Sequence, residues 1–228
     1  MYEIDLLFAQ AKSIIVLDGL LDWNPFVRHL AKAPFLVAAD GAADSLGAIG
    51  ISPQYVVGDG DSCIMDRCKE RYQLIEEQTT TDFQKSLQFT YNQGKRPTLV
   101  LGVNGGEFDH ILGNFYIVMQ EKEPRTVTFL DAQQHKNRTI IKVGVPLANE
   151  IFYGKSPVGT NVSLLPFPEM VCYSTGLTWP LTGNRLSLEQ NLSLRNKTSS
   201  KNWSVNVEGK GLVVYDLPFE IRSIESSS

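Results

Sequence analysis

Basic residues are too few and too scattered in this sequence to suit a protein that follows the phosphates of a nucleic acid. Lysine and arginine number 21 against 25 acidic residues, which gives a formal net charge of −4. Nucleic-acid binding normally needs a basic face on which such residues are concentrated. We therefore expect no nucleic acid among the partners of this chain.

Cysteines and long apolar runs are also scarce. The three cysteines, Cys63, Cys68 and Cys172, are an odd number at no metal-ligand spacing, so they indicate reduced thiols rather than a disulfide framework. The first residues have neither the basic start of a signal peptide nor an apolar run long enough to span a membrane. From this we expect a cytoplasmic protein that does not bind membranes.

What the chain does contain is a first half that alternates short apolar runs with stretches of helical periodicity. Strands are predicted at residues 14–17, 35–39, 55–57, 98–101 and 127–130, and helices at residues 25–32, 82–93 and 109–120. This alternation is typical of an α/β fold, a doubly wound and mostly parallel sheet with helices on both faces.

The second half has a different composition. Beyond Lys142, glycine, proline, serine, threonine and asparagine become frequent, helical periods disappear, and short alternating segments appear, such as residues 161–165 and 204–207. This pattern predicts antiparallel β structure. We expect two domains, an α/β domain at residues 1–142 and an all-β domain at residues 143–228.

Acidic and small residues follow the predicted strands of the first domain. They are Asp40 and Gly41, Asp59 and Asp61, and Gly105, Gly106 and Asp109, while Thr81 and Asp82 stand at a predicted helix start. In an open α/β sheet the carboxyl ends of the strands share one edge, so these residues should converge on one crevice. Taken singly, each acid could equally be a helix cap or part of an Asx-turn.

Several carboxylates at one edge predict a bound cation. Like charges held close oppose ionisation unless a cation compensates them, and a site of carboxylate oxygens suits Mg²⁺, which commonly bridges protein acids and substrate phosphates. Gly105 and Gly106 would let backbone N–H groups approach those phosphates at the start of the next helix. His110 would cap or orient at this edge. The sequence thus predicts a magnesium-dependent site for a nucleotide polyphosphate.

Two loop motifs can be excluded. The GDGDS segment lacks the ligand and the glycine that a calcium loop requires, because Cys63 and Ile64 stand at those positions. The segment that ends in Gly154 and Lys155 lacks the first glycine of a phosphate-binding loop, where Asn149 stands.

Taken in order, the motifs ADGAADSL, VVGDGDS, TTTDFQKSL and GGEFDHILGN, followed by VSLLPF, STGLTWPL and SLRN, resemble the thiamin pyrophosphokinase family. The resemblance runs from about Val37 to Asn196. It implies a nucleotide-binding α/β domain followed by a β-sandwich, and a homodimer that holds thiamin between the ATP edge of one subunit and the small domain of the other. The implied reaction moves the terminal diphosphate of ATP to the hydroxyl of thiamin and releases AMP.

The resemblance also assigns individual residues. Magnesium would be held by Asp59, Asp61 and Asp82, which are also the catalytic residues, and the ATP crevice would include Asp40, Gly41, Thr81, Gly105, Gly106, Asp109 and His110. Thiamin would contact Trp179, Ser193 and Asn196. A cationic thiazolium ring stacked on an indole is physically sensible, because the ring quadrupole attracts positive charge. Without the resemblance, Trp179 would be interpreted as a core aromatic.

The sequence departs from the family pattern at four positions, and these leave other functions open. Ala42 replaces a glycine, Gly60 a phenylalanine and Glu107 an arginine, and Thr79 stands where many members have an aspartate. One alternative is a non-catalytic protein that binds thiamin or nucleotide, and another is a related enzyme that diphosphorylates a pterin alcohol. Retention of the acids favours the kinase, because a decayed site should lose its costly like-charge cluster first.

Overall fold

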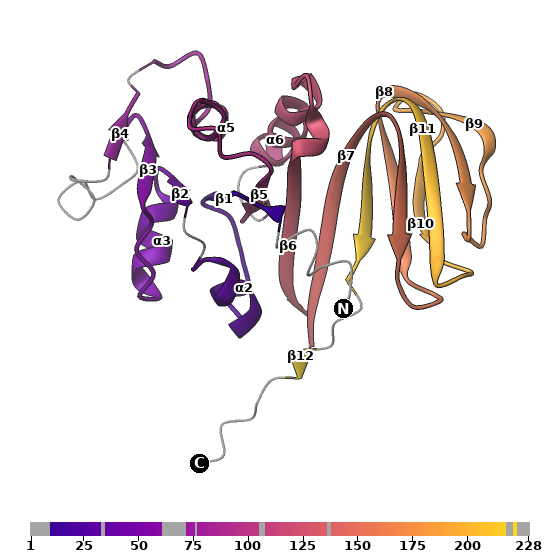
Figure 1. The fold of residues 1–228 in the computed structure, drawn as a ribbon, viewed down its shortest axis with the longest axis horizontal. Coiled ribbons are helices and arrows are strands. Elements are labelled where there is room, and N and C mark those ends of the chain that lie inside the picture. Colours follow the sequence, from indigo (N-terminus) through magenta and orange to yellow (C-terminus); the bar gives the residue numbers. More distant parts are fainter. Residues whose placement is uncertain are drawn as a thin grey trace. The chain divides into compact units, whose positions relative to one another are not determined.

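The computed structural model describes residues 10–32, 35–60, 72–75, 77–104, 108–135, 138–217 and 221–222. The chain forms two compact units (Figure 1). The first, which we call the α/β unit, consists of Leu7–Ile117 and Thr126–Asp131. The second, the antiparallel unit, consists of Met1–Leu6, Val118–Arg125 and Ala132–Ser228. The boundary that we expect from the sequence at residues 142 and 143 remains a prediction.

The α/β unit is built on a parallel sheet. Its strands are β1 (Ser13–Val16), β2 (Leu36–Ala39), β3 (Tyr55–Gly58), β4 (Tyr72–Leu74), β5 (Thr98–Leu101) and the first part of β6 (Val127–His135). They lie in the order β6-β5-β1-β2-β3-β4 with parallel pairing throughout. Every residue of β1, β2 and β5 is buried, as expected for strands covered on both faces.

Helices connect these strands and cover the sheet. They are α2 (Pro25–Leu30), α3 (Ala42–Ala48), α5 (Asp82–Asn92) and α6 (Phe108–Gln120), which is followed by a 3₁₀ turn, η2 (Pro124–Thr126). The chain builds the sheet outward from β1 in one direction and then returns to the other side of β1 with β5. Because such crossovers are right-handed, α2 and α3 cover one face and α5 and α6 the other.

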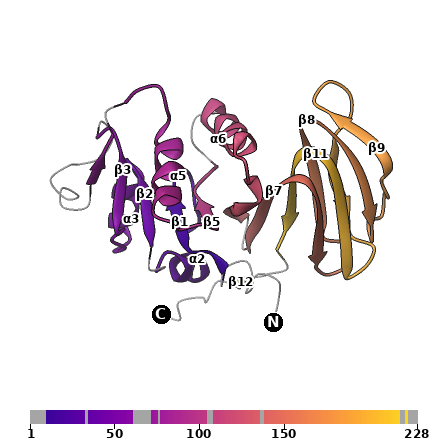
Figure 2. The same cartoon turned by 45° about the horizontal axis from the view of Figure 1, so that its top comes forward.

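The antiparallel unit contains the longest strands. They are β7 (Arg138–Lys155), β8 (Asn161–Thr175), β9 (Thr182–Ser187), β10 (Ser193–Lys197), β11 (Asn202–Asp216) and β12 (Ile221–Arg222). The order is β10-β8-β11-β7, with β9 paired to β8 and β12 to β7. Figure 2 shows β7, β8 and β11 side by side.

An aromatic cluster forms part of the core of the antiparallel unit. Trp203 is 2% exposed and donates its indole N–H to Ser156 Oγ at 3.0 Å. The rings of Phe152 and Tyr215 lie 5.4 and 5.6 Å from the Trp203 ring, at tilted and edge-on angles typical of aromatic pairs. The opposite position on β7 is Gly154, where a Cβ atom would lie 2.2 Å from the Trp203 ring. The indole therefore fills the space that a side chain on residue 154 would take.

The fold class predicted from the sequence is confirmed, since parallel strands with helices precede antiparallel strands. Helix α3 and strand β4 are not predicted. The first is short and rich in alanine and glycine, and the second has three residues at the edge of the sheet and no buried side chain. The predicted β segments at 161–165 and 204–207 are parts of strands that are each 15 residues long. Among the described residues, no helix is long and apolar enough to cross a membrane.

We predict that Gly154→Ala destabilises the protein by about 1–3 kcal/mol, the usual result of overfilling a packed core. The added methyl group would press on the buried Trp203 ring. Urea unfolding followed by tryptophan fluorescence measures the loss. Gly47→Ala in α3 is the control, because a Cβ there meets nothing within 4 Å and alanine favours the helix. Equal midpoints for the wild type and Gly154→Ala would show that the ring does not cover residue 154.

Candidate active site

A cleft of about 810 Å³ opens in the α/β unit beside the ends of β1, β2, β3 and β5. The strand order reverses between β5 and β1, and this is the place where ligands bind in open α/β sheets. The lining includes these residues predicted from the sequence: Asp40, Gly41, Asp59, Thr81, Asp82, Asp109 and His110. Asp61, Gly105 and Gly106 lie outside the described residues, as does Glu107.

Three carboxylates meet in this cleft. Asp40 follows β2, Asp59 follows β3 and Asp82 is the first residue of α5. One carboxylate oxygen from each lies within 4.8 Å of those of the other two. Oxygen ligands of an octahedral Mg²⁺ lie about 2.1 Å from the ion, and opposite ligands are therefore about 4.2 Å apart. Small side-chain rotations would bring the three oxygens into that range, so the donor set fits a hard divalent cation.

Asp40 is buried and held by contacts on several sides. The residue is 1% exposed, its φ angle is +34°, and its N–H donates to the carbonyl oxygen of Val57 at 3.0 Å. The hydroxyl of Tyr72 donates to Asp40 Oδ1 at 2.8 Å. Aspartate tolerates a positive φ better than most residues do, although the conformation is uncommon. The backbone therefore turns sharply where the carboxylate enters the cleft.

Lys85 supplies a positive charge to the other two carboxylates. Its side chain is 3% exposed, and its ammonium lies 3.2 Å from Asp82 Oδ1 and 3.7 Å from Asp59 Oδ2. Gln78 also donates its side-chain N–H to Asp59 Oδ2 at 2.7 Å. Buried lysines are rare unless they are paired. Lys85 is therefore the internal counter-ion of the acidic cluster.

The pKa of Asp82 reflects this competition of charges. Partial burial raises the pKa of Asp82 above its ordinary value, and the negative charges of Asp40 and Asp59 add to the increase. The hydrogen bond and the positive charge of Lys85 act in the opposite direction but are outweighed. In the folded protein Asp82 therefore binds its proton more tightly than it would in the unfolded chain, as expected for a partly buried carboxyl group beside other carboxylates.

The start of α5 fixes the position of Asp82. Thr81 is the N-cap of this helix, and its hydroxyl accepts from the N–H of Gln84 while the side chain of Gln84 accepts from the N–H of Thr81. This reciprocal pair is a capping box, which defines where a helix begins. Because Lys85 comes three residues after Asp82 on the same helix, the two side chains lie on one face. Local sequence thus builds one side of the cluster.

Two glycines allow the loops after β1 and β5 to touch. A Cβ on Gly19 would lie 2.0 Å from the carbonyl oxygen of Gly102, and Gly102 itself has a φ of +73°. A Cβ on Gly102 would lie 2.4 Å from the carbonyl oxygen of Leu17. Both glycines line the cleft. Backbone rather than side chain therefore forms this part of the cleft wall, which suits the close approach of a ligand.

Asp109 and His110 lie in the first turn of α6, and both are exposed. The N–H of His110 donates to Asp109 Oδ1 at 3.0 Å. Both residues line the cleft, together with Gly113 and Asn114 one turn later. The wall that α6 provides is therefore polar and open to solvent.

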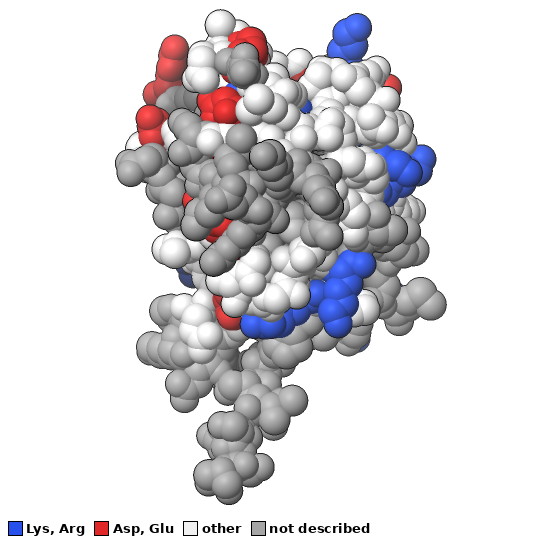
Figure 3. Space-filling view, turned by 90° about the vertical axis from the view of Figure 1, so that its left-hand side faces the viewer, with Lys and Arg blue, Asp and Glu red and all other residues white. Residues whose placement is uncertain are grey.

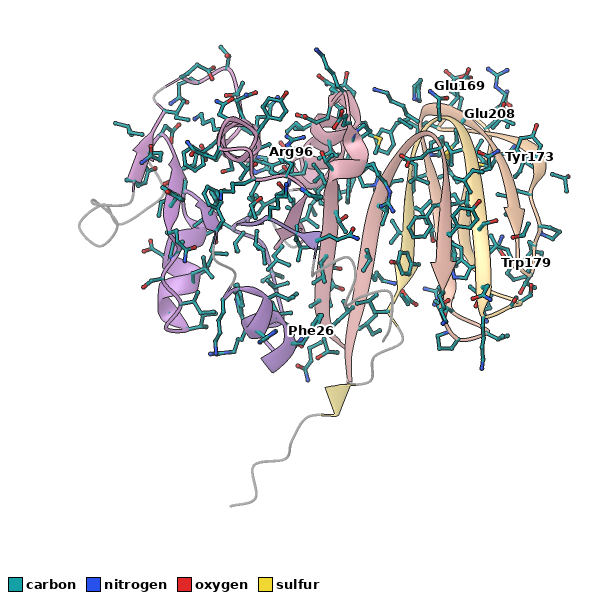
Figure 4. The ribbon with its side chains drawn as sticks, viewed as in Figure 1. Phe26, Arg96, Glu169, Tyr173, Trp179 and Glu208 are labelled. Carbon is teal, nitrogen blue, oxygen red and sulfur yellow. The ribbon has the colours of Figure 1, made fainter. Side chains whose placement is uncertain are left out.

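The residues predicted to contact thiamin lie in the antiparallel unit, and Figure 4 labels one of them, Trp179. Trp179 is 59% exposed, Asn196 is 3% exposed, and Ser193 begins β10. The amide of Asn196 accepts from the N–H of Trp179 at 3.1 Å and donates to its carbonyl oxygen at 2.7 Å. The interpretation of Trp179 as a core aromatic is wrong, because its side chain is exposed. Asn196 anchors the backbone that presents this indole.

Charge is unevenly distributed on the face of the molecule that Figure 3 shows. Among the described residues, acidic side chains gather toward the upper left and basic ones lie toward the lower and right-hand edges. The basic side chains seen there do not form one continuous area. This face therefore offers no continuous basic area among the described residues.

Sequence reasoning missed several residues of this site. Lys85 and Gln78 could have been found, because the first is one helical turn from Asp82 and the second precedes the TTTD run. Tyr72 gave no such signal, since β4 is not recognisable from the sequence. Asp18, which follows β1 and lines the cleft, accepts from the hydroxyl of Ser45 at 3.0 Å. Asp18 could have been found from the sequence in the same way as Asp40 and Asp59, because it too follows a predicted strand of the parallel sheet.

Comparison with known proteins places these features in one family. Residues 26–130 match the family model described as thiamin pyrophosphokinase, catalytic domain. Thiamine pyrophosphokinase 1 of Oryza sativa subsp. japonica is 30% identical over 151 residues, which cover 59% of this chain and 55% of that protein. The match thus spans about half the length of that relative. Thiamine pyrophosphokinase 3 of the same plant is 24% identical over 187 residues, or 75% of this chain and 68% of that one.

A solved structure shows the same fold. The thiamin pyrophosphokinase from Candida albicans superposes with a TM-score of 0.72 at 17% sequence identity, over 92% of this chain and 91% of that one. The combination of a parallel sheet with helices and a set of antiparallel strands is therefore shared.

We predict that Lys85→Met destabilises the protein at pH 7.5 in the presence of a chelator by about 3 kcal/mol, as when one partner of a buried ion pair is removed. The three carboxylates would then lack their internal cation. A carboxyl group whose folded pKa is raised binds its proton more tightly in the folded protein, so the loss should shrink as the pH falls toward 5.

Chemical unfolding at both pH values measures the effect, with Lys122→Met, at an exposed position, as the control. An equal loss at pH 5 and pH 7.5 would mean that Lys85 contributes packing rather than charge.

Proposed function

The chain belongs to the thiamin pyrophosphokinase family, and from this premise we propose that it transfers the terminal diphosphate of ATP to the hydroxyl of thiamin, giving thiamin diphosphate and AMP. The observation that carries the proposal is the cluster of Asp40, Asp59 and Asp82 with Lys85 in a cleft at the strand ends. Oxygen-only carboxylate clusters at such an edge suit the magnesium complex of a nucleotide.

Magnesium would be held by Asp59 and Asp82, as the sequence predicts, with Asp40 as the third carboxylate within reach. Asp61, the other predicted ligand, is outside the described residues. When bound, Mg²⁺ neutralises phosphate oxygens and stabilises the charge that develops on the leaving AMP. The donor set contains no sulfur or nitrogen ligand, which favours a hard cation over zinc.

In the proposed reaction the hydroxyl oxygen of thiamin attacks the β-phosphorus of ATP in line. The new oxygen–phosphorus bond forms as the bond to the bridging oxygen between the α- and β-phosphorus breaks, and AMP leaves with that electron pair. The hydroxyl proton passes to Asp59 or Asp82. Lys85 would stabilise the charge of the transferring diphosphate, and positioning contributes most of the rate.

Thiamin would meet the exposed indole of Trp179. A cation over the face of tryptophan is attracted by about 0.5–2 kcal/mol. Asn196 would act indirectly, because its amide is bonded to the backbone of Trp179, while Ser193 would supply a hydroxyl beside it. As the family resemblance implies, we propose a homodimer in which the antiparallel unit of one subunit completes the thiamin site of the other.

A non-catalytic binding protein is the second candidate, and the departures at Thr79 and Glu107 favour it. Thr79 has no carboxylate of its own, but Glu77, two residues earlier in the same turn, has one. Glu77 accepts hydrogen bonds from the backbone and hydroxyl of Thr79 and from the hydroxyl of Thr80. Those hydroxyl bonds lower the pKa of Glu77. The described lining of the cleft contains Gln78 and Thr80 but not Glu77, so this acid does not take the place of the missing aspartate.

We predict that the wild-type protein, given ATP, Mg²⁺ and thiamin, releases AMP and thiamin diphosphate in equal amounts, and that Asp59→Asn lowers kcat at least about a hundredfold. The amide keeps the shape of the carboxylate but removes the charge that a hard cation needs. Chromatographic quantification of both products measures the reaction. Asp44→Asn, in the first turn of α3, is the matched control and should keep its activity.

A folded wild-type protein that binds ATP or thiamin without releasing AMP would contradict the kinase and favour the binding protein. AMP release with a pterin alcohol but not with thiamin would favour the third function.

We further predict that Trp179→Ala raises KM for thiamin about tenfold while KM for ATP changes less than twofold, because the indole would contact only the cationic acceptor. Trp179→Phe, which keeps an aromatic face, should recover most of the affinity. Steady-state kinetics with each substrate varied in turn measures both constants. Equal changes in the two KM values would point to a structural tryptophan.

A further inference from the structure

Tyr72 reaches the acidic cluster from a strand that carries none of the family motifs. It begins β4, the edge strand, where it pairs with Val56 of β3. Its hydroxyl donates to Asp40 Oδ1 at 2.8 Å. The motif VVGDGDS lies before Tyr72 and the TTTD run lies after it. The contact is therefore a feature of this chain that its motifs do not contain.

Gly58 makes this contact possible. A Cβ atom on Gly58 would lie 2.7 Å from Asp40 Cβ, 3.0 Å from Asp40 Cγ and 3.1 Å from the Tyr72 hydroxyl. Real Cβ atoms essentially never lie as close as 2.7 Å to another atom, and contacts of 3.0–3.1 Å are tight. A side chain at residue 58 would therefore displace the Asp40 carboxylate and crowd the Tyr72 hydroxyl. Because Gly58 has no side chain, Asp40 and the Tyr72 hydroxyl can occupy the space beside its Cα atom and contact each other.

The backbone of Asp40 needs such support. Its φ of +34° is an uncommon conformation for a residue with a side chain, and such conformations persist where the surroundings hold them. The bond from Asp40 N–H to the Val57 carbonyl oxygen holds the main chain, and the bond from Tyr72 holds the carboxylate. Together they fix where Asp40 lies relative to Asp59 and Asp82.

The chemistry of the donor also matters. Asp59 and Asp82 share the ammonium of Lys85, which would compete with a bound cation for their oxygens. The phenol of Tyr72 is a neutral donor, so it orients Asp40 without cancelling its charge. Groups that hydrogen-bond to a metal-ligating carboxylate orient it, and their loss typically weakens metal binding about 10- to 100-fold.

We propose that Tyr72 is a positioning residue for the divalent cation. Its hydroxyl fixes the carboxylate of Asp40, and the absence of a side chain at Gly58 leaves room for this contact. This rests on the proposed function in that the cation is the one used with ATP. It adds an outer contact to the site, so that Asp40 is oriented by a neutral donor, as Asp59 is by the amide of Gln78.

The test is the affinity of the full-length protein for Mn²⁺ alone, measured by electron paramagnetic resonance without ATP or thiamin. We expect Tyr72→Phe, which removes one oxygen atom, to weaken Mn²⁺ binding about tenfold. Tyr91→Phe, at an exposed position on α5, should bind as the wild type does. The unfolding temperature of Tyr72→Phe with a chelator should fall by only about 3–6 °C, since a lost hydrogen bond to a carboxylate costs about 1.5 kcal/mol and each kcal/mol shifts the unfolding temperature of a chain of this size by about 2–4 °C.

A second pair of variants tests whether the Asp40–Tyr72 contact needs a residue without a side chain at position 58. Gly58→Ala should weaken Mn²⁺ binding at least as much as Tyr72→Phe, whereas Gly47→Ala, where a Cβ meets nothing within 4 Å, should have no effect. With Mg-ATP and thiamin, Tyr72→Phe should need about tenfold more Mg²⁺ for half-maximal rate and recover the wild-type kcat when Mg²⁺ is saturating.

Unchanged Mn²⁺ affinity in Tyr72→Phe would overturn the proposal, and so would the absence of Mn²⁺ binding to the wild type. Loss of Mn²⁺ binding in step with a large fall in unfolding temperature would also overturn it, because Tyr72 would then be structural. The kinase function fails separately. A wild type that binds Mn²⁺ through Tyr72-dependent contacts but releases no AMP would leave this inference intact and refute the reaction.

Discussion

Electrostatic repulsion among three carboxylates is the constraint on which the rest of the site depends. Asp40, Asp59 and Asp82 belong to different segments of the chain, yet their oxygens lie within 4.8 Å of one another. Two unit charges about 4 Å apart near a protein surface repel by about 4 kcal/mol. A fold that keeps such an arrangement must compensate it, and Lys85, with a side chain that is 3% exposed, does so from within.

The parallel sheet explains why the acids meet, and local contacts explain how each is held. Parallel pairing places the ends of β2 and β3 next to each other, so Asp40 and Asp59 become neighbours without any long-range design. Asp82 enters from α5, whose first turn is fixed by the capping box of Thr81 and Gln84. Each carboxylate then has its own donor, a phenol, an amide or an ammonium. These contacts orient the carboxylates but leave the cluster with a net negative charge, which suits a divalent cation.

The sequence predicted the edge of the sheet at which the acids gather because that prediction needs little more than strand periods and the rule that parallel strands end together. It predicted neither Lys85 nor Tyr72 as part of the site. Lysine at a helical position is normally solvated, and only the tertiary fold buries this one. Tyr72 belongs to a strand of three residues, too short to show a period.

The antiparallel half was predicted from its composition and from short alternating segments, which do not determine how its strands pair or in what register. Residues 161–165 and 204–207 alternate clearly, but the long strands to which they belong contain bulges, for example between Val207 and Lys210. Each bulge shifts which side chains share a face. The family resemblance could suggest that Trp179 contacts a ligand. The sequence could not show that the side-chain amide of Asn196 is hydrogen-bonded to the backbone of Trp179.

Charge counting links the cluster to the substrates proposed for it. Three ionised carboxylates and one ammonium leave two negative charges, which would repel a polyphosphate and attract a cation. One divalent cation cancels both charges of this cluster, while Asp18 and Asp109 keep the rest of the cleft acidic. In the proposed function, an anionic nucleotide should therefore enter together with its metal rather than ahead of it. A thiazolium ring is favoured by the same potential. The acidity of the cleft therefore favours cationic species in general, and the selection of a particular acceptor must come from shape and stacking, the role proposed above for the indole of Trp179.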